Sequence, residues 1–311
     1  MSHDALPAVW IRPVGSTGLT ITAVTVGGSP LGVVEPAEEG IATVRAALSS
    51  PVRALDTSNG YPDSERRVGV ALAQAGGLPG DFLLVTKVDP RGSDYSGDRV
   101  RASIAESRDR LGVDELPLVH LHDPEYHDFD YVTQPGGAVD TLVALREAGE
   151  IGALGLAGGD SEVMARYLDL GVFDVLLTHS RWSLLDRSAG GIIESALGQG
   201  MAVFNAAVYG AGILAKPGST SYGYREAPAE LVEAATAMRA VCERFGTDVR
   251  TAALQFSTRD SRFATTVVGM SHPDRVAATV ASVSAELPEE IWDELEALVP
   301  PAHAWLDHRA P

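Results

Sequence analysis

The feature that most constrains the fold of this sequence is an alternation, repeated eight times. Short apolar runs rich in β-branched residues alternate with amphipathic segments of helical spacing. Nearly continuous apolar runs are typical of parallel strands that are buried on both faces. The alternation therefore predicts an α/β fold, a (β/α)8 TIM barrel. The runs span residues 20–28, 52–57, 81–87, 116–122, 151–157, 173–179, 201–206 and 264–270.

A doubly wound open sheet is the alternative fold. Such folds usually hold a pyrophosphate on a G-x-G-x-x-G turn after the first strand, and no such turn follows residues 20–28. We see no hairpin signal between the runs, and only the loop near 210–227 is rich in glycine, proline and serine. We therefore predict a single domain over residues 1–311, with a core at about 14–285 and a C-terminal helix and tail at 286–311.

The intervening segments carry start signals of helices. A side-chain oxygen before the first turn accepts a hydrogen bond from a free backbone N–H, and proline is favoured in the first turn. An acidic stretch precedes the segment 43–48, and Gly171 is a stop signal. The expected start residues are Asp98, Asp160 or Ser161, Pro228, Pro273 and Pro288.

Charge and cysteine content restrict the partners and the compartment. The formal net charge is −18, which repels phosphate backbones and anionic lipids, so we expect neither a nucleic-acid nor a membrane partner. No apolar stretch approaches the ~18 residues of a membrane helix, and the N-terminus shows no signal peptide. The one cysteine, Cys242, can form neither an internal disulfide nor a paired-cysteine metal site, and we expect it to be buried. These features predict a cytoplasmic protein that binds no metal. We expect it to be a monomer or a small homo-oligomer.

Three successive apolar runs end in ionisable residues. Asp56 ends the second run and Tyr61 follows it, Lys87 ends the third, and His122 ends the fourth. A buried strand has no reason to end in such residues unless they are needed there, and the active site of a barrel lies at these strand ends. Each residue alone has an ordinary structural explanation, but the combination points to one site. His120, two residues before His122, is expected to pack against the barrel wall or the helices.

This set of side chains suits proton transfer next to a carbonyl group. A free tyrosine titrates near pH 10, and a nearby ammonium group stabilises the phenolate and lowers that pKa. A carboxylate keeps the lysine charged, and a histidine can bind the reacting oxygen by a hydrogen bond. Hydride transfer from a bound nicotinamide cofactor is the natural partner reaction.

The sequence also resembles the aldo-keto reductases. The resemblance runs in order from about residue 14 to 280 and rests on stretches such as GSTGLTITAVTVGGSPLG, ALDTSNGYPDSERRVGVAL, LLVTKV, LPLVHLHDPE and VVGMSHPDRV. It implies that Asp56, Tyr61, Lys87 and His122 form the catalytic tetrad of the family. Tyr61 would donate and accept the proton, Lys87 and Asp56 would tune it, and His122 would orient the substrate.

Within the family, the stretches SRWSLLDRSA and NAAVYGAGILA resemble the aldose (fucose, D-threo-aldose or galactose) dehydrogenase branch. This likeness implies oxidation of a cyclic sugar at C1 to a lactone. It also admits a generic aldehyde, ketone or pyridoxal-type reductase. The substrate would be a small carbonyl compound or sugar. We expect its identity to depend on the loops 88–97, 123–137 and 215–227 and on the tail 300–311.

The resemblance further implies an NAD or NADP site. A cation that grips the 2′-phosphate of NADP in the family is missing from Gly269–His272, which favours NAD, although Arg275 keeps NADP possible. Family residues that hold the nicotinamide are replaced by Ala157-Gly158-Gly159, His179 and Ala206. The expected cofactor-binding residues are Gly28, His179, Val208, Tyr209, Gly210, Gly212, Gly269, Ser271, Arg275 and Thr279.

Two other functions are compatible with part of this pattern. A Schiff-base aldolase would use Lys87 as its nucleophile, but Tyr61, Asp56 and the cofactor loops argue against it. A regulatory subunit would bind the cofactor without turnover, and the intact tetrad argues against that. Four aromatic residues are candidates for lining the substrate pocket, and packing is the role that we favour for each: Trp182, Tyr209, Tyr222 and Trp305.

Overall fold

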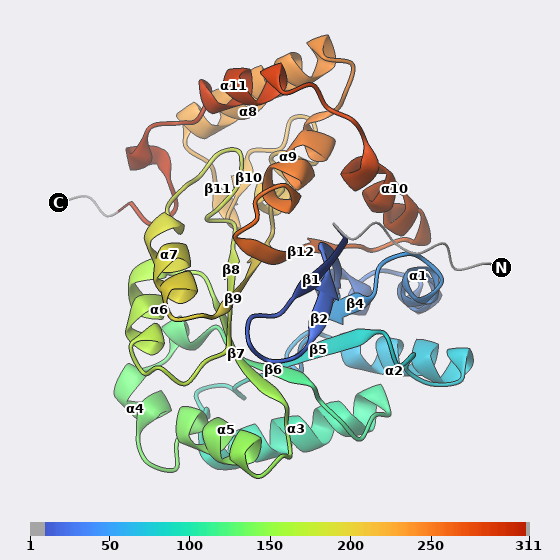
Figure 1. Ribbon diagram of the computed structural model, residues 1–311, viewed down its shortest axis with the longest axis vertical. Coiled ribbons are helices and arrows are strands. Elements are labelled where there is room, and N and C mark those ends of the chain that lie inside the picture. Colours follow the sequence, from blue (N-terminus) through green and yellow to red (C-terminus); the bar gives the residue numbers. More distant parts are fainter. Residues whose placement is uncertain (1–9, 309–311) are drawn as a thin grey trace.

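The structure is a computed structural model that describes residues 10–308; the N-terminal residues 1–9, part of the segment examined for a signal peptide, and the tail residues 309–311 lie outside the described part. Eight parallel strands close into a barrel, surrounded by helices (Figure 1). This confirms the predicted (β/α)8 fold. In barrel order the strands are β12 (Phe263–Gly269), β3 (Val24–Gly27), β4 (Ala54–Asp56), β5 (Leu83–Val88), β6 (Leu118–His122), β7 (Ala153–Gly158), β8 (Val175–His179) and β9 (Ala202–Ala206).

Helices connect successive strands and form the outer ring. Between β9 and β12 the chain makes a long excursion that includes α8, and α11 packs on α8 (Figure 1). None of the helices within residues 10–308 is both long and apolar enough to cross a membrane. The helices are α1 (Ala37–Leu48), α2 (Ser64–Ala75), α3 (Gly97–Leu111), α4 (Phe129–Thr133), α5 (Ala138–Glu147), α6 (Ser161–Leu168), α7 (Gly190–Gly198), α8 (Ala229–Arg244), α9 (Val249–Thr258), α10 (Pro273–Ser284) and α11 (Glu290–Glu296), with short 3-10 turns η2 (Ser29–Gly32), η3 (Pro124–Tyr126), η4 (Gly210–Gly212) and η5 (Ala302–Ala304).

The prediction of one strand over 20–28 is wrong. This run is divided into β2 (Thr20–Thr22) and β3, and β2 pairs with β1 (Ile11–Pro13) in an antiparallel hairpin. The turn between them contains Gly15 and Gly18 at positive φ, a conformation that glycine adopts readily. A second hairpin, β10 (Ser221–Tyr222) with β11 (Arg225–Glu226), lies in the loop near 210–227. Both hairpins escaped notice because the strands have only two or three residues.

Most helix starts lie where the sequence predicts them. Asp160 caps α6 by accepting hydrogen bonds from the N–H groups of Glu162 and Val163, and Pro273 is the first residue of α10. The predicted cap of α3 is wrong: Ser96 accepts from Arg99 N–H, and Asp98 lies in the first turn. Since Ser96 and Asp98 both favour this position, spacing alone did not decide between them.

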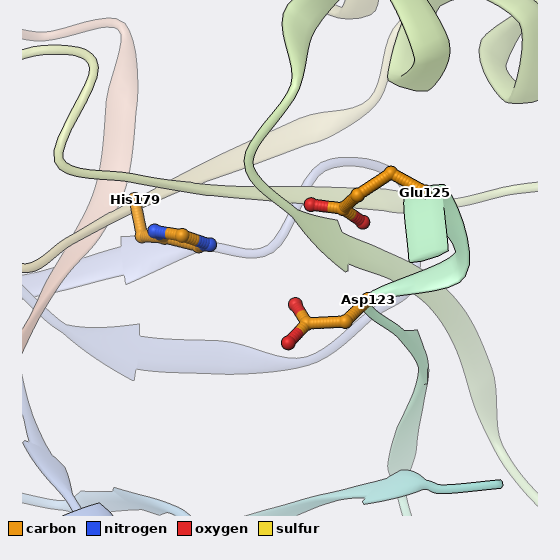
Figure 2. A group of neighbouring side chains, drawn as sticks. All are labelled: Asp123, Glu125 and His179. Atoms are coloured by element: carbon orange, nitrogen blue, oxygen red, sulfur yellow. The ribbon is translucent and has the colours of Figure 1, made fainter. Parts of the chain in front are cut away.

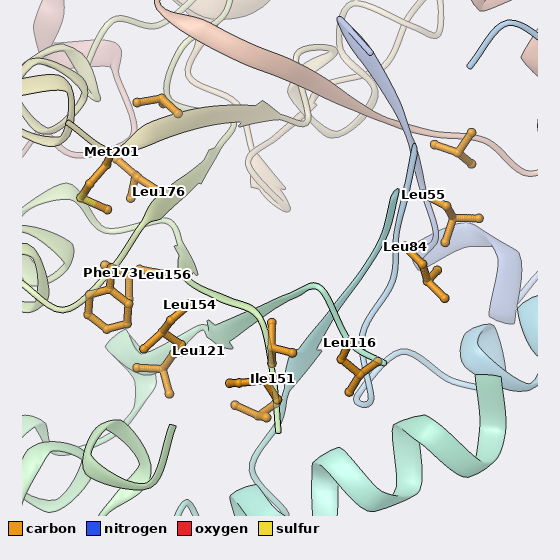
Figure 3. Close-up of a cluster of buried hydrophobic side chains, with 14 of the residues drawn as sticks. Leu55, Leu84, Leu116, Leu121, Ile151, Leu154, Leu156, Phe173, Leu176 and Met201 are labelled. Atoms are coloured by element: carbon orange, nitrogen blue, oxygen red, sulfur yellow. The ribbon is translucent and has the colours of Figure 1, made fainter. Parts of the chain in front are cut away.

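The strands bury both faces. Toward the helices they present a large apolar cluster that includes Leu55, Leu84, Leu121 and Leu176 (Figure 3). The other face fills the barrel with a second cluster, to which Val14 and Ile21 of the first hairpin belong. Burial on both faces explains why the strands read as continuous apolar runs. Cys242 is buried as expected, within a third cluster between α8, α9 and α11.

Candidate active site

The four predicted catalytic side chains meet at the carboxyl-terminal ends of three neighbouring strands. Asp56 is the last residue of β4, Lys87 lies near the end of β5, and His122 is the last residue of β6. Tyr61 lies in the turn between β4 and α2. Parallel neighbours in the order β4-β5-β6 bring these ends to one edge of the barrel. The site is thus assembled by strand order, although the catalytic roles stay predictions.

Lys87 is the centre of this group. Its Nζ lies 2.5 Å from Oδ1 of Asp56, donates to the carbonyl oxygen of Thr57 at 2.7 Å and lies 3.3 Å from the hydroxyl of Tyr61. The side chain is 1% exposed, so its charge needs these partners. Burial lowers the pKa of Lys87, but the charge of Asp56, its hydrogen bond and the charges of Tyr61 and Asp89 together raise it by more, and the net pKa lies above its ordinary value. The lysine is therefore a stable ammonium group.

Tyr61 differs from its expected state. Burial raises its pKa to about 12, while the charge of Lys87 acts in the opposite direction without prevailing. The expectation that the ammonium group brings the pKa below the ordinary value is therefore wrong for the protein in this form. The cost of placing a phenolate in a buried site outweighs the attraction of one shared cation. The hydroxyl of Tyr61 therefore carries its proton at neutral pH.

His122 is held from both sides. Its backbone N–H donates to the hydroxyl of Tyr95 at 2.9 Å, and that hydroxyl donates to the carbonyl oxygen of Val88 at 2.8 Å. Its Nδ1 lies 2.6 Å from Oδ1 of Asp89. The ring of Tyr61 meets the imidazole edge to face, with 5.5 Å between the centroids. The histidine is thus fixed in position and orientation.

Asp89 was not identified from the sequence as a site residue, although it lies in the loop 88–97 that was assigned to substrate specificity. It follows Lys87 by two residues, and residues i and i+2 of a strand point to the same face. That spacing is the signal that could have found it. His120, on the same face of β6 as His122, lies inside the barrel with its ring 6.0 Å from that of Phe204. Burial holds the pKa of His120 well below its ordinary value, so it is neutral.

A second group of side chains lies beside His122, formed by Asp123, Glu125 and His179; we call it the acceptor cluster. One ligand atom from each lies within 4.8 Å of the others. Figure 2 shows the two carboxylates and one end of the imidazole ring pointing toward a common space. Asp123 has a left-handed backbone (φ 45°), and its Oδ1 lies 3.8 Å from Nε2 of His122. The sequence singled out His179 but neither carboxylate.

Two glycines at the end of β7, its last residue Gly158 and the following Gly159, make room for the acceptor cluster. A Cβ on Gly158 would lie 2.5 Å from Oε2 of Glu125, and a Cβ on Gly159 would lie 3.0 Å from the ring of His179 and 2.4 Å from Nη1 of Arg181. The N–H of Gly159 donates to Oε1 of Glu125 at 2.5 Å. The missing side chains in this segment are therefore replaced by a carboxylate from the β6 loop.

The electrostatics of the acceptor cluster favour hydrogen-bond donors as its ligand. Burial raises the pKa of Glu125, and burial lowers the pKa of His179 to about 4, so the imidazole is neutral at neutral pH. The charge of Asp123 raises the pKa of His179 and the charge of Arg181 lowers it by less, so burial is the main reason for the low value. The expectation that the protein holds no metal stays a prediction.

The predicted cofactor loop after β9 has an irregular backbone. Gly210, Ala211 and Gly212 all have positive φ. A Cβ on Gly210 would lie 2.6 Å from the ring of Tyr222, so glycine is needed there for packing. Val208 is buried, and Tyr222 is buried with its hydroxyl on the carbonyl oxygen of Ser180, which confirms a packing role for Tyr222.

Two guanidinium groups lie near Tyr209. Burial raises the pKa of Tyr209 to about 12, and the charges of Arg250 and Arg275 oppose this shift. Arg275 is exposed in the first turn of α10, whose N-terminus follows the end of β12. A helix N-terminus with two nearby cations fits the phosphate groups of a nicotinamide cofactor. The sequence pointed to Arg275 but not to Arg250.

The remaining predicted cofactor residues differ in exposure. Gly269, at the end of β12, is exposed, and Ser271 is half-buried beside it. Gly28 has a packing reason of its own, because a Cβ there would lie 2.9 Å from the carbonyl oxygen of Asp56. Thr279 is 7% exposed. Cofactor contact by these residues stays a prediction.

A (β/α)8 barrel with a buried Lys–Asp pair, a tyrosine and a histidine at its mouth defines an oxidoreductase of the nicotinamide-dependent class. The chain belongs to the aldo/keto reductase family, whose model matches residues 23–300. It is 30% identical to the L-galactose dehydrogenase of Arabidopsis thaliana, over 94% of each chain. It is 28% identical to the pyridoxal 4-dehydrogenase of Microbacterium luteolum, over 91% of this chain and 96% of that one.

Similarity to solved structures supports the fold. The aldo-keto reductase AKR11C1 from Bacillus halodurans, in its holo form, superposes with a TM-score of 0.79 at 23% identity, over 96% of this chain and 99% of that one. A D-threo-aldose 1-dehydrogenase from Pseudomonas is 28% identical over 90% of this chain and 94% of its own length. Family and relatives together identify the chain as an NAD(P)-dependent oxidoreductase, as the sequence predicted.

Proposed function

We propose that this protein oxidises a cyclic aldose at C1 to the corresponding lactone, with Asp56, Tyr61, Lys87 and His122 as its catalytic residues. The observation that carries the substrate class is the acceptor cluster, whose Asp123 lies 3.8 Å from Nε2 of His122. A sugar presents hydroxyl donors on the carbons next to the reacting one. Carboxylate oxygens and a neutral imidazole accept such donors. The names of the two sugar dehydrogenases among the relatives support the same class.

In this reaction the C1 hydroxyl loses its proton while the hydrogen on C1 leaves as a hydride. The nicotinamide cofactor, when bound, supplies the hydride acceptor. Tyr61, through its phenolate form, takes the hydroxyl proton, and Lys87 stabilises the negative charge of that form from 3.3 Å. Asp56 keeps Lys87 charged. His122 binds the oxygen that becomes the carbonyl of the lactone.

We propose NAD as the preferred cofactor, because the segment Gly269–His272 lacks a cation for a 2′-phosphate. Eleven residues would hold this cofactor, namely Arg250 and the ten predicted from the sequence: Gly28, His179, Val208, Tyr209, Gly210, Gly212, Gly269, Ser271, Arg275 and Thr279. We also propose that residues 1–311 form one domain that works in the cytoplasm as a monomer or small homo-oligomer, without nucleic-acid or membrane partners. The acidic composition and the single cysteine support this part of the proposal.

The experiment that tests this function follows absorbance of the reduced nicotinamide with NAD+ or NADP+ and a panel of aldoses, simple alcohols and pyridoxal-type substrates. Tyr61→Phe, which removes only the phenolic oxygen, is the matched control. Turnover of a sugar that is lost in Tyr61→Phe, with the lactone identified by mass spectrometry, is the expected result. Turnover of aldehydes alone, tested in both directions, would replace the aldose proposal with a generic reductase. Cofactor binding without any turnover would favour a regulatory subunit.

A further inference from the structure

We propose that Asp89 is a positioning residue for His122: its carboxylate holds the imidazole through Nδ1 and makes Nε2 a hydrogen-bond donor toward the oxygen of the reacting carbon. The contact is short, with 2.6 Å between Nδ1 and Oδ1. Both side chains are 12% exposed, so water competes little for the contact. Charge-assisted hydrogen bonds of this length are among the stronger ones in proteins.

The carboxylate of Asp89 is itself fixed. Its second oxygen, Oδ2, accepts hydrogen bonds from the hydroxyl of Ser58 and, at 2.7 Å, from the N–H of Gly60. A Cβ on Gly60 would lie 2.5 Å from Oδ1 of Asp89, so glycine at this position allows the close approach. The turn that carries Tyr61 thus also holds Asp89 in place. One oxygen is engaged by the turn, and the other is directed at His122.

This arrangement determines which ring nitrogens of His122 carry a hydrogen. Because Nδ1 faces a carboxylate, Nδ1 carries a hydrogen. A neutral ring would then leave Nε2 without one, as an acceptor only. Nε2 can donate to a substrate oxygen only if the ring is the doubly protonated cation. The carboxylates of Asp89 at Nδ1 and Asp123 near Nε2 both favour this cation.

The local charges agree with the geometry. Burial lowers the pKa of His122, but the charge of Asp89, its hydrogen bond and the charge of Asp123 together raise it by more, so the net pKa lies above the ordinary value. Asp123 acts in the same direction, while the ammonium group of Lys87 opposes it. Burial raises the pKa of Asp89, but the charge of His122 and the hydrogen bonds from His122, Ser58 and Gly60 together lower it by more, so the net pKa lies below the ordinary value. The titratable and charged groups around His122 come from four strands and their loops. The β4 region contributes Asp56 and Tyr61, and the β5 region contributes Lys87 and Asp89. The β6 region contributes His120 and Asp123, and β8 contributes His179.

The first test uses the unaltered protein and needs no turnover, so its failure is distinct from failure of the proposed function. Nitrogen-15 NMR of the imidazole groups reports how many ring nitrogens carry a proton, and His122→Gln identifies the signal by its loss. We expect His122 to stay doubly protonated above pH 7, beyond the ordinary histidine pKa of about 6.5. A ring that is neutral at pH 7 would overturn the proposal.

The second test compares Asp89→Asn with Asp109→Asn, a control that removes an exposed carboxylate on α3. In Asp89→Asn the titration of His122 should move down by roughly 1 to 3 pH units. The falling limb of kcat/KM for carbonyl reduction should move by the same amount. Above that limb, kcat/KM falls by about tenfold per pH unit of movement and recovers at lower pH. Asp109→Asn should leave both unchanged.

A merely structural role for Asp89 predicts a different pattern. It would lower the thermal midpoint and reduce kcat/KM at every pH, with the His122 titration unmoved. That outcome in Asp89→Asn would contradict the proposal. Should Asp89→Asn fail to fold, the titration of the unaltered protein still decides the charge state on which the proposal depends.

Discussion

Oε2 of Glu125 fills the space that a side chain at Gly158 would need: a Cβ there would lie 2.5 Å away from it and 2.6 Å from Sδ of Met164. The two positions belong to different strand ends, β6 and β7, yet side chains at both would share one space. The carboxylate also accepts a hydrogen bond from the N–H of Gly159, the next residue along the chain. The acceptor cluster thus depends on a glycine 33 positions away in the sequence.

The first prediction follows from this contact. Gly158→Ala should lower the free energy of unfolding by about 1–3 kcal/mol, because the methyl group overpacks the site. Glu125→Ala should restore part of that loss when the two changes are combined, since it removes one of the two side chains in the way and leaves Met164. Urea unfolding of the two single variants and the double variant gives the coupling energy. Gly191→Ala, where a Cβ meets no atom within 4 Å, is the control. Additive effects of the two changes would contradict the contact.

The second prediction concerns pH. Because the pKa of Tyr61 is raised to about 12, the resting enzyme holds the phenol proton throughout the physiological range. Reduction of a carbonyl uses that proton, so its kcat/KM should be flat with pH below the titration of His122. Oxidation needs the phenolate, so its kcat/KM should rise about tenfold per pH unit over the same range. One substrate pair measured in both directions tests this.

The opposite pattern would contradict this prediction. If the pKa of Tyr61 lay below neutral, kcat/KM for reduction would depend on pH and kcat/KM for oxidation would be constant. A variant with Lys87→Met should retain the rising limb of oxidation at lower overall rate, because the cation that opposes the effect of burial is gone. A plateau of oxidation already at neutral pH in the unaltered enzyme would refute the buried, protonated Tyr61.

The fold was predictable from the sequence because each strand and helix of the barrel has its own local pattern of apolar residues. Continuous apolar runs such as 173–179 are typical of strands buried on both faces. The grouping of Asp56, Lys87 and His122 was also predictable, since all three end successive parallel strands. What failed was the division of the run 20–28 at Ala23, where a hairpin strand passes into a barrel strand. Two- and three-residue strands carry too little period to be recognised.

The missed site residues have a common physical cause. Glu125 and Asp123 lie on a loop, and the carboxylate of Glu125 occupies a space that Gly158 leaves open, which is a contact in space rather than a pattern in sequence. The pKa of Tyr61 was misjudged because the residue types do not reveal how deeply the side chain is buried. Burial raises this pKa, whereas the charge of Lys87 lowers it. Arg250 lies on α9, far from any motif, and reaches the Tyr209 region only through packing of helices around the barrel.

The third prediction concerns Glu106, which supports the loop of the active site from α3. Its carboxylate binds the guanidinium of the buried Arg99 through both oxygens, at 2.9 and 2.7 Å, and accepts from Asn59 at 3.2 Å. The hydrogen bonds of Arg99 are the main reason that the pKa of Glu106 is lowered to about 2. Glu106→Gln should lower the free energy of unfolding at pH 7 by about 1–3 kcal/mol.

The sign of the pH dependence follows from the lowered pKa. A carboxylate with a folded-state pKa below its unfolded value of about 4.3 stabilises the fold fully above that value. The contribution is lost as the pH falls toward 2. The difference between Glu106→Gln and the unaltered protein should therefore shrink between pH 4.3 and 2 in urea unfolding. Glu147→Gln, at an exposed position on α5, should show no such difference. A gap between Glu106→Gln and the unaltered protein that does not change with pH would contradict this assignment.

The last prediction concerns the choice of cofactor. Arg250 and Arg275 both act on Tyr209 at the rim formed by β9 and α10, and no cation lies in the segment Gly269–His272. We therefore expect these two guanidinium groups to donate hydrogen bonds to the 2′-phosphate of bound NADP. Arg250→Ala and Arg275→Ala should each raise the Kd of NADP+ about tenfold, equivalent to about 1.4 kcal/mol, and change the Kd of NAD+ less. Tyrosine and tryptophan fluorescence, or calorimetry, measures both constants without turnover. Arg101→Ala on α3, which lies on another side of the barrel (Figure 1), is the control. An unaltered protein that binds NADP+ more tightly than NAD+ would reverse the proposed preference, and equal losses for both cofactors would assign the two arginines to the shared pyrophosphate.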